Sequence, residues 1–408
     1  MKRCLLFAVM VILNAAMISA QNLGTIVFQK GENGFDTYRI PAMVHAQDGS
    51  ILAFAEARKF SRSDTGDIDL VLKRSTDGGK TWGEIITVWD DGGNVCGNPS
   101  PVVVSRTGRI VLLSTWNHGE DHTGAIRERT GKDTRRVYSM YSDDHGLTWS
   151  APVEITSSVK LDEWTWYATG PCHALETSSG RLVVPCNHGI SIDGKPAGSH
   201  SHVIYSDDFG KTWNVLGGVE TAPVQAEANE AKVEELPGGD IIITSRTDAE
   251  GRNLNVFTFK NIRKATGTWG QMAHSSSHND GIVTEKNSCN GELLSVPVIR
   301  SSDGRRMHLL LQSVPSGPKR SNVGIYYKGV CEQKEYSPQA LAADWEGFFR
   351  VTSIGSAYSV MALQKNGKVG FMFEEKTYYP TSGAGYTIVY DAFTIEEITG
   401  GAYTLNQK

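Results

Sequence analysis

The chain has 408 residues and a formal net charge of −5, with 40 basic residues against 45 acidic ones. This balance argues against nucleic acid as a partner, because a nucleic-acid-binding surface needs a local excess of lysine and arginine. The densest basic stretch, residues 127–136, also contains Glu128 and Asp133, and we interpret it as a solvated loop.

The first residues have the order of a secretory signal peptide. A basic start, Met1-Lys2-Arg3, precedes an apolar run from residue 5 to residue 17 and the small residues Ser19-Ala20. That run is shorter than the about 20 residues that a membrane-spanning helix needs. We therefore expect cleavage near Ala20 and a single mature domain, residues 21–408, without a membrane span. We also expect export to the periplasm, the cell surface or the medium.

Short apolar runs, many of them preceded by turn dipeptides, recur along the whole mature chain. They lie at residues 51–54, 102–104, 110–113, 181–184, 240–243, 307–311 and 369–373. Turn pairs such as Asp48-Gly49 and Asn366-Gly367 stand before several of them. Long amphipathic patterns are scarce, and a short helix is expected at residues 337–345. Hairpins repeated in this way predict an all-β domain.

One octapeptide occurs three times, as Ser75–Trp82, Ser142–Trp149 and Ser206–Trp213, and fits Ser-x-Asp-x-Gly-x-Thr-Trp. The copies start 67 and 64 residues apart, and residues 266–269 look like a worn fourth copy. A fixed unit at such a period indicates a repeat architecture. Blades of about 60 residues divide the mature chain into six, so we predict a six-bladed β-propeller.

The residues of the octapeptide describe a hairpin corner that stabilises itself. Aspartate at a turn accepts hydrogen bonds from nearby backbone amides, and glycine supplies a backbone angle that other residues resist. The tryptophan then opens the next strand and places an indole under the turn. We expect a structural role for all three copies. They resemble the Asp-box of the sialidase family, which also occurs in other β-propellers.

The segment Tyr38-Arg39-Ile40-Pro41 resembles the Phe/Tyr-Arg-Ile-Pro motif of the same family. Together with the three Asp-boxes, the resemblance covers nearly the whole mature chain. It implies an exo-α-sialidase that hydrolyses terminal sialic acids from glycoproteins, glycolipids and oligosaccharides with retention. A trans-sialidase and a non-catalytic glycan-binding propeller are the alternatives.

The resemblance also implies a set of substrate-binding residues. Arg39, Arg246 and Arg320 match the three arginines that hold the substrate carboxylate, and a guanidinium suits this task because its rigid fork binds a carboxylate bidentately. Glu374 matches the carboxylate that orients the first arginine. Arg58 matches an additional arginine of the pocket.

Three further residues match the catalytic groups of the family. Asp64, in a polar loop, matches the acid/base. Tyr358 matches the nucleophile, and Glu230 matches the base that activates it. The sequence leaves open alternatives at several of these positions: Asp67 and Asp69 for the acid, Glu227 for the base, Tyr378, Tyr379 and Tyr386 for the nucleophile, and Arg300 and Arg350 for the third arginine. We expect Glu234 and Glu235 to face solvent.

The cysteines and histidines indicate less about the protein than the motifs above, and they concern a possible disulfide and a possible metal site. Cys172 and Cys186 flank a predicted hairpin centred on residue 179, so they are either a disulfide across it or two buried thiols. His200 and His202 share one face of a strand, with His188 nearby in sequence. No third ligand stands at a familiar metal-site spacing, so we expect neither a metal nor another cofactor.

Overall fold

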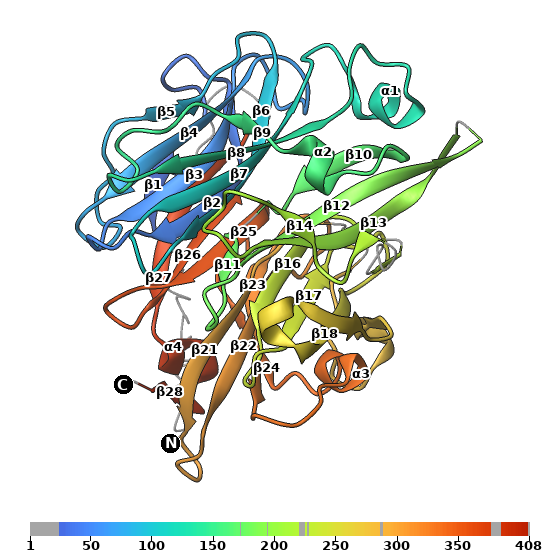
Figure 1. Ribbon diagram of the computed structural model, residues 1–408. Helices are drawn as coiled ribbons and strands as arrows, with labels where there is room; N and C mark the ends of the chain where they lie inside the picture. The colour runs from blue at the N-terminus through green and yellow to red at the C-terminus, as the bar shows by residue number, and fades with distance from the viewer. Residues whose placement is uncertain are drawn as a thin grey trace, which may run out of the picture.

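A computed structural model describes residues 24–406, except 172, 194, 220–224, 227, 286–288 and 377–384. The predicted signal peptide lies outside this range. The described chain is an all-β domain, as predicted, and its five sheets follow one another around a common centre in the manner of a β-propeller (Figure 1). No helix in the described part of the chain is long and apolar enough to cross a membrane.

The largest sheet consists of two antiparallel meanders joined by one parallel pair, Ile68 with Val95. Its first meander has β2 (Thr37–His45), β3 (Ile51–Arg58), β4 (Ile68–Ser75) and β5 (Ile86–Trp89). Its second has β6 (Val95–Val103), β7 (Ile110–Asn117), β8 (Arg136–Ser142) and β9 (Val153–Glu154).

The other four sheets are antiparallel and follow in chain order. The first of these sheets contains β10 (Trp164–Thr169), β11 (Leu175–Glu176), β12 (Leu182–Ile192), β13 (Lys195–Ser206), β14 (Asn214–Val215) and β15 (Gln225–Ala226), and the second contains β16 (Ala231–Glu235), β17 (Ile241–Ser245), β18 (Asn253–Asn261), β19 (Thr266–Trp269) and β20 (Ala273–His274). The third contains β21 (Leu293–Arg300), β22 (Arg306–Pro315), β23 (Val323–Val330), β24 (Gly347–Arg350) and β28 (Tyr403–Leu405). The fourth contains β25 (Ser356–Leu363), β26 (Val369–Glu375), β27 (Thr387–Phe393) and β1 (Thr25–Phe28). Short helices are α1 (Thr123–Glu128), α2 (Thr156–Val159), α3 (Pro338–Ala342) and α4 (Ile395–Thr399).

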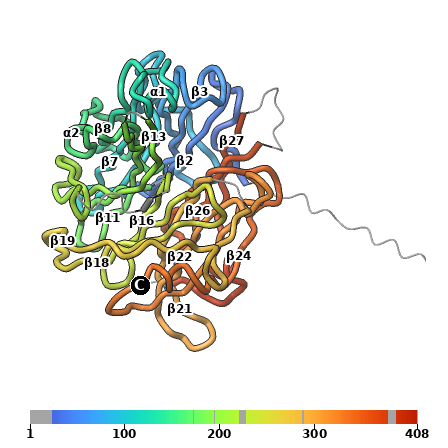
Figure 2. Tube along the Cα trace, turned by 90° about the vertical axis from the view of Figure 1, so that its right-hand side faces the viewer, coloured from blue at the N-terminus to red at the C-terminus, as the bar shows by residue number. Residues whose placement is uncertain are grey.

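The two ends of the chain close the ring. Strand β1 pairs with β27, so that Ile26 lies opposite Val389 in the last sheet. The colours of Figure 2 run around the molecule from blue through green and yellow to red, and the first and last sheets are neighbours. Residues near the start of the chain can therefore share a site with residues near its end.

The three octapeptides form the corners between the third and fourth strands of their meanders. In the second copy, Asp144 accepts hydrogen bonds from the Ser142 hydroxyl at 2.8 Å and from the Thr148 amide and hydroxyl at 2.9 and 2.6 Å. Gly146 has φ of 84°, and a Cβ there would lie 2.4 Å from Leu52 of the neighbouring meander. Each corner is thus held by its own residues, as predicted, and its glycine also permits close packing.

Inner strands are distorted where they reach one end of the ring. The ladder between β2 and β3 shifts register after Arg39, and Ile40 has φ of 58°. The β6–β7 ladder shifts after Gly97, where Asn98 has φ of 54°. A positive φ is costly for a β-branched residue such as isoleucine and marks a position that the surrounding structure enforces. These bulges re-aim side chains toward a common pocket.

The structure corrects one expectation about the strand after Glu230. Glu234 does not face solvent: it is 5% exposed, and its Oε1 lies 3.3 Å from Nε2 of His173. Glu292 lies 3.2 Å from the other ring nitrogen. Burial acts to lower the pKa of His173, but the two carboxylates raise it to about 10. Glu235 is half-buried and accepts two hydrogen bonds from Ser178.

The predicted hairpin centred on residue 179 is present, because Leu175 pairs with Val183. It is short, however, and the ladder partners of Cys186 are Thr169 of β10 and His202 of β13. Cys172 lies outside the described residues, so the disulfide stays a prediction.

Candidate active site

A polar pocket of about 300 Å³ lies where the distorted ends of the inner strands converge. Its lining includes seven of the eight residues singled out from the sequence: Arg39, Arg58, Asp64, Glu230, Arg246, Arg320 and Tyr358. The eighth, Glu374, is fully buried behind Arg39. Residues spread over more than 330 positions of the chain therefore meet at one place.

Tyr358, Glu230 and Arg246 form a hydrogen-bonded triangle. The Tyr358 hydroxyl donates to Glu230 Oε1 at 2.5 Å. Arg246 Nη1 donates to the Tyr358 oxygen and to Glu230 Oε2, each at 2.9 Å. Glu230 and Arg246 come together because they stand at the matching ends of the β16–β17 hairpin, where the Arg246 amide donates to the Glu230 carbonyl.

Burial and nearby charges determine the protonation states of Tyr358 and Glu230. Burial raises the pKa of Tyr358 well above its ordinary value, and Glu230 adds to the rise, while Arg246 opposes it. Burial also acts to raise the pKa of Glu230, but Arg246 and the hydrogen bond from Tyr358 bring it below its ordinary value. At neutral pH the phenol is therefore protonated beside an ionised carboxylate.

Arg39 is fixed by a bidentate pair with Glu374. Its Nε and Nη2 donate to the two Glu374 oxygens at 3.0 and 3.1 Å. The same carboxylate accepts a hydrogen bond from the Ile40 amide at 2.9 Å. The strained backbone at Ile40 thus directs its amide toward Glu374. The guanidinium of Arg39 lies 5.0 Å from the ring centre of Tyr358, and that of Arg320 lies 5.4 Å from it. Three arginines thus surround the phenol.

Asp64 reaches the pocket from the loop after β3. Its Oδ1 lies 2.7 Å from Arg58 Nη1 and 4.0 Å from Arg39 Nη1, and its side chain is 69% exposed. Burial acts to raise the pKa of Asp64, but Arg58 and Arg39 bring it below its ordinary value. The other side of Arg58 donates to Glu56 Oε2 at 3.1 and 2.6 Å. Glu56 is thereby a positioning residue that the sequence did not indicate.

Except for Tyr386, the alternative residues that the sequence left open lie away from the pocket or outside the described residues. Among the described ones, Asp67 pairs with Lys59 at 3.0 Å, Asp69 is buried in β4, Arg300 pairs with Asp303, and Arg350 is exposed at the end of β24. Tyr386 does approach the pocket, since the Arg39 guanidinium lies 5.0 Å from its ring. Glu227, Tyr378 and Tyr379 are outside the described residues.

The basic stretch at residues 127–136 is not simply a solvated loop. Its first two residues, Arg127 and Glu128, are the last two of α1. Arg127 and Arg135 line the pocket together with Trp166 of β10. Arg135 is 5% exposed, and its guanidinium lies 4.1 Å from the ring centre of Trp166. Composition suggested a solvated loop because Glu128 and Asp133 interrupt the stretch. No local pattern distinguishes an arginine that folds inward from one that does not.

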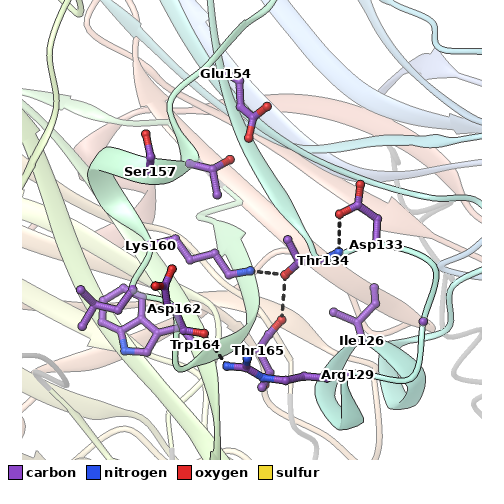
Figure 3. A pocket seen from close by; sticks show the side chains of 13 residues that line it. Ile126, Arg129, Asp133, Thr134, Glu154, Ser157, Lys160, Asp162, Trp164 and Thr165 are labelled. Carbon is purple, nitrogen blue, oxygen red and sulfur yellow. Dashed lines mark hydrogen bonds between the residues drawn. The ribbon is translucent and has the colours of Figure 1, made fainter.

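A larger cavity, of about 710 Å³, lies on the other side of α1 (Figure 3). There Lys160 donates to the Thr134 hydroxyl, and Arg129 donates to the carbonyl of Asp162. No tyrosine is among the described residues that line it. This cavity is the larger of the two, but Tyr358, Glu230 and Arg246 line the smaller pocket. We therefore take the smaller pocket as the candidate active site.

His188 of β12 and His202 of β13 are fully buried in their sheet, and the half-buried His200 lies beside them, with its ring centre 5.6 Å from that of His188. His188 Nδ1 lies 2.9 Å from His202 Nδ1, and His202 Nε2 lies 3.0 Å from the Tyr167 hydroxyl. The His188 ring stacks on Trp164 with centroids 3.7 Å apart. Burial lowers the pKa of His202 to about 3. This group packs beside the pocket wall and contributes no residue of the triangle.

Comparison with known proteins identifies the family of the chain. A family model described as a BNR repeat-like domain matches residues 49–319. A sialidase of Bacteroides fragilis is 30% identical over 310 residues, which cover 73% of this chain and 53% of that protein. The chain thus spans about half the length of this curated relative.

Solved structures share the fold. Hadza microbial sialidase Hz136 superposes with a TM-score of 0.74 at 24% identity, over 92% of this chain and 69% of that one. An intramolecular trans-sialidase from Ruminococcus gnavus, solved with oseltamivir carboxylate, gives a TM-score of 0.71 at 19% identity, over 93% of this chain and 99% of that one. At these identities the likeness concerns the fold.

Proposed function

The chain belongs to the sialidase family, and on this basis we propose that it is an exo-α-sialidase that releases terminal sialic acids from glycoconjugates with retention of configuration. The observation that carries the proposal is the 2.5 Å hydrogen bond from the Tyr358 hydroxyl to Glu230, inside a pocket that also holds Arg39, Arg246 and Arg320. A tyrosine with an adjacent ionised base is an activated nucleophile.

A tyrosine nucleophile suits this substrate for an electrostatic reason. Sialic acid carries a carboxylate on its anomeric carbon, and an attacking aspartate or glutamate would meet a like charge there. A neutral phenol avoids this repulsion. As the Tyr358 oxygen bonds to the anomeric carbon, Glu230 takes the phenolic proton, and the bond to the leaving oxygen breaks. Water later cleaves the tyrosyl–sugar bond in the reverse sense, which gives net retention.

The remaining groups divide between binding and proton transfer. The three arginines hold the substrate carboxylate while positive charge develops on the anomeric carbon. Asp64 donates its proton to the leaving oxygen and then accepts one from the attacking water. Glu374 keeps Arg39 in place through its bidentate pair.

We also propose that the sheets count as six blades, with the largest sheet supplying two of them. Support comes from the apolar core, which divides into clusters between consecutive meanders. One cluster joins Phe54 of the first meander to Leu112 of the second, and another joins Tyr38 to Ile388 across the closure of the ring. Export with cleavage near Ala20 remains part of the proposal, and N-terminal sequencing of the mature protein tests it.

A trans-sialidase is the second candidate, because the same residues would form the tyrosyl intermediate and only the acceptor would differ. Its support is the fold shared with the Ruminococcus gnavus enzyme. A non-catalytic glycan-binding propeller is disfavoured, since such a protein has no use for a tyrosine paired with a buried base.

Incubation with an aryl α-sialoside tests the proposal. We expect release of the aryl alcohol together with free sialic acid, and proton NMR at early times should show the α-anomer first. An internal sialic acid glycoside, or a sialylated acceptor sugar, would instead identify a transferase. Binding without any release of the aryl alcohol would leave only the glycan-binding alternative.

A further inference from the structure

One arginine of the interior has no carboxylate partner. Arg252, which immediately precedes β18, is 1% exposed and is the largest fully buried side chain among the described residues. Its Nη1 donates to the Cys289 carbonyl at 3.2 Å, and its Nη2 donates to the Thr244 hydroxyl at 3.4 Å. Its Nε has no hydrogen-bond partner, and no carboxylate oxygen lies within 4.0 Å, in the part of the chain that the structure describes.

The charge of Arg252 lowers the stability of the fold. Burial lowers the pKa of Arg252 to about 10, so the guanidinium is still charged at neutral pH. A charge taken out of water loses hydration free energy, and hydrogen bonds to neutral groups restore only part of it. An apolar side chain of the same length would avoid this cost. An effect on a charged neighbour would explain why an arginine stands at this position.

Arg252 lies beneath the pair formed by Glu230 and Arg246. Thr244 of β17 stands two residues before Arg246 and on the same face of the hairpin, because side chains alternate along a strand. Two residues of a strand span about 7 Å, so the guanidinium bonded to Thr244 lies on the order of 10 Å from the Glu230 carboxylate. Of the two carboxylates that favour the charged form of Arg252, Glu230 has the larger influence and Glu292 the smaller.

The groups around Glu230 differ in whether a substrate can contact them. They are Lys232, which is fully buried two residues farther along the chain, Arg135, Arg246, Arg252, Arg320, Tyr358 and Cys289. The phenol of Tyr358 and the thiol of Cys289 are uncharged, since burial raises both pKa values, that of Cys289 to about 11. Three of these four arginines line the pocket, and Arg252 does not. Of the four, Arg252 alone acts on Glu230 from a position that the substrate does not reach.

A bound substrate changes the balance of charge at Glu230. In the free protein, burial acts to raise the pKa of Glu230, but Arg246, the hydrogen bond from Tyr358 and Arg320 bring it below its ordinary value. The substrate carboxylate brings a negative charge beside Glu230 and offsets the effect of these arginines. Glu230 has to be ionised at this stage, because it takes the phenolic proton. The charge of Arg252 is not offset in this way, since no substrate group contacts it.

We propose that Arg252 is a positioning residue that acts through Glu230: from behind the pocket it keeps this carboxylate ionised while the substrate carboxylate occupies the arginines in front. This inference rests on the proposed function, which supplies the place of the substrate carboxylate and the role of Glu230 as the base. An Arg252 that only joined Cys289 to Thr244 would contribute to the stability of the fold and leave the pH dependence of turnover unchanged.

The test measures kcat and kcat/KM for an aryl α-sialoside as functions of pH, since kcat reports the enzyme–substrate complex and kcat/KM the free enzyme. Arg252→Gln removes the charge and keeps a donor for the Cys289 carbonyl. The protonated form of Glu230 is then favoured, so the acidic limb of kcat should move to higher pH. At the acidic end kcat should fall by roughly tenfold, the effect of one charge at about 10 Å in a protein interior. In the free enzyme Arg246 and Arg320 keep this limb at lower pH, so kcat/KM should change less over the same range.

Three further variants separate the charge of Arg252 from its packing. Arg252→Met removes the charge without leaving a buried polar group, and should show the same shift. Arg252→Lys keeps a positive charge and should restore the wild-type limb. Arg181→Gln is the matched control, because Arg181 is 3% exposed, pairs with Asp207 and does not line the pocket. It should lower the melting temperature and leave the limb in place.

Two results overturn the inference. One is an acidic limb that stays in place in both Arg252→Gln and Arg252→Met, whatever their melting temperatures. The other is a limb that moves as far in Arg252→Lys as in Arg252→Gln.

Calorimetry with the 2,3-unsaturated analogue of sialic acid separates this inference from the proposed function, because it needs no turnover. Titrations in buffers of different ionisation enthalpy give the number of protons taken up on binding. Arg252→Gln should take up more than the wild type, since the carboxylate of the analogue drives a proton onto Glu230, and the excess should vanish when Glu230→Gln is added. An excess without hydrolysis by the wild type supports the role of Arg252 and contradicts the sialidase. Equal uptake in the wild type and Arg252→Gln contradicts the role of Arg252 whether or not hydrolysis occurs.

Discussion

The Asp-box corners and the pocket both depend on carboxylates that accept hydrogen bonds, but the partners of these carboxylates lie at very different distances along the chain. Asp144 is satisfied by Ser142 and Thr148, at most four residues away. Glu374 is satisfied by Arg39, 335 residues away, and Tyr358 by Glu230, 128 residues away. A corner can therefore form with its own hairpin, whereas the pocket exists only when the ring has closed.

The residues of the corners stabilise the fold, whereas the residues of the pocket are the proposed catalytic and substrate-binding groups. The corners repeat three times and lie between outer strands, while the pocket occurs once, at the distorted ends of inner strands. Changes in the corners should affect the free energy of unfolding, and changes in the pocket should affect turnover.

The largest effect is expected for Tyr358→Phe. Removal of the hydroxyl eliminates the nucleophile and leaves the arginines in place, so turnover should fall on the order of a hundredfold or more while a sialic acid analogue still binds. Glu230→Gln should lose a similar factor, and the double variant should be little worse than either single one, because the two residues act as a unit. Steady-state kinetics on an aryl sialoside measures this.

Tyr326→Phe is the matched control, since its hydroxyl donates to the carbonyl of Val283 on the surface. It should keep wild-type turnover. Wild-type turnover in Tyr358→Phe would contradict the assignment of the nucleophile.

A smaller effect is expected for Arg246→Ala. This change removes a donor to the substrate carboxylate and should weaken binding of a sialic acid analogue by about 2 to 3 kcal/mol. Calorimetry measures the loss. A methyl ester of the substrate should be a poor substrate for the wild-type enzyme for the same reason. If the ester were hydrolysed as fast as the free acid, the three arginines would not have the proposed role.

The corners should show the opposite behaviour. Asp144→Ala removes three hydrogen bonds of one turn and should lower the free energy of unfolding by about 1 to 2 kcal/mol. Turnover per folded molecule should stay near wild type. Asp143→Ala is the control, because this neighbour forms only an exposed pair with Arg109 and should cost about 0.5 kcal/mol or less. Loss of turnover at unchanged stability in Asp144→Ala would show that the corner takes part in the reaction.

The smallest effect is a shift along the pH axis. Arg58 and Arg39 bring the pKa of Asp64 below its ordinary value. Asp64 must be protonated to act as the acid, so kcat/KM of the wild type should fall as pH rises from the acidic range. Arg58→Gln removes part of the lowering, so the protonated form should persist to higher pH and the alkaline limb should move upward. Lys59→Gln, which affects only the pair with Asp67, should leave the limb in place.

The same contrast explains what could be predicted from the sequence. The corners, the strands and the turn glycines were predictable because their causes are local, as Gly146 and Asp144 show. Seven pocket residues and Glu374 were identified only through resemblance to a family, since no local rule places Arg39 beside Glu374. Arg135 was missed because its inward position depends on Trp166 and Asn98, which lie on other strands. Glu234 was misjudged because its partner, His173, lies in the segment between β10 and β11, 61 residues away along the chain.

The central claim is that Tyr358 forms a covalent bond to the sugar, and a fluorinated sialosyl fluoride tests it most directly. The fluorine next to the anomeric carbon slows hydrolysis of the intermediate, so the wild-type protein should gain the mass of one fluorosialosyl group. Peptide mapping by mass spectrometry should place that group on Tyr358, and Tyr358→Phe should remain unlabelled. A label on Asp64, Glu230 or another tyrosine, or rapid turnover with no labelled species, would contradict the account.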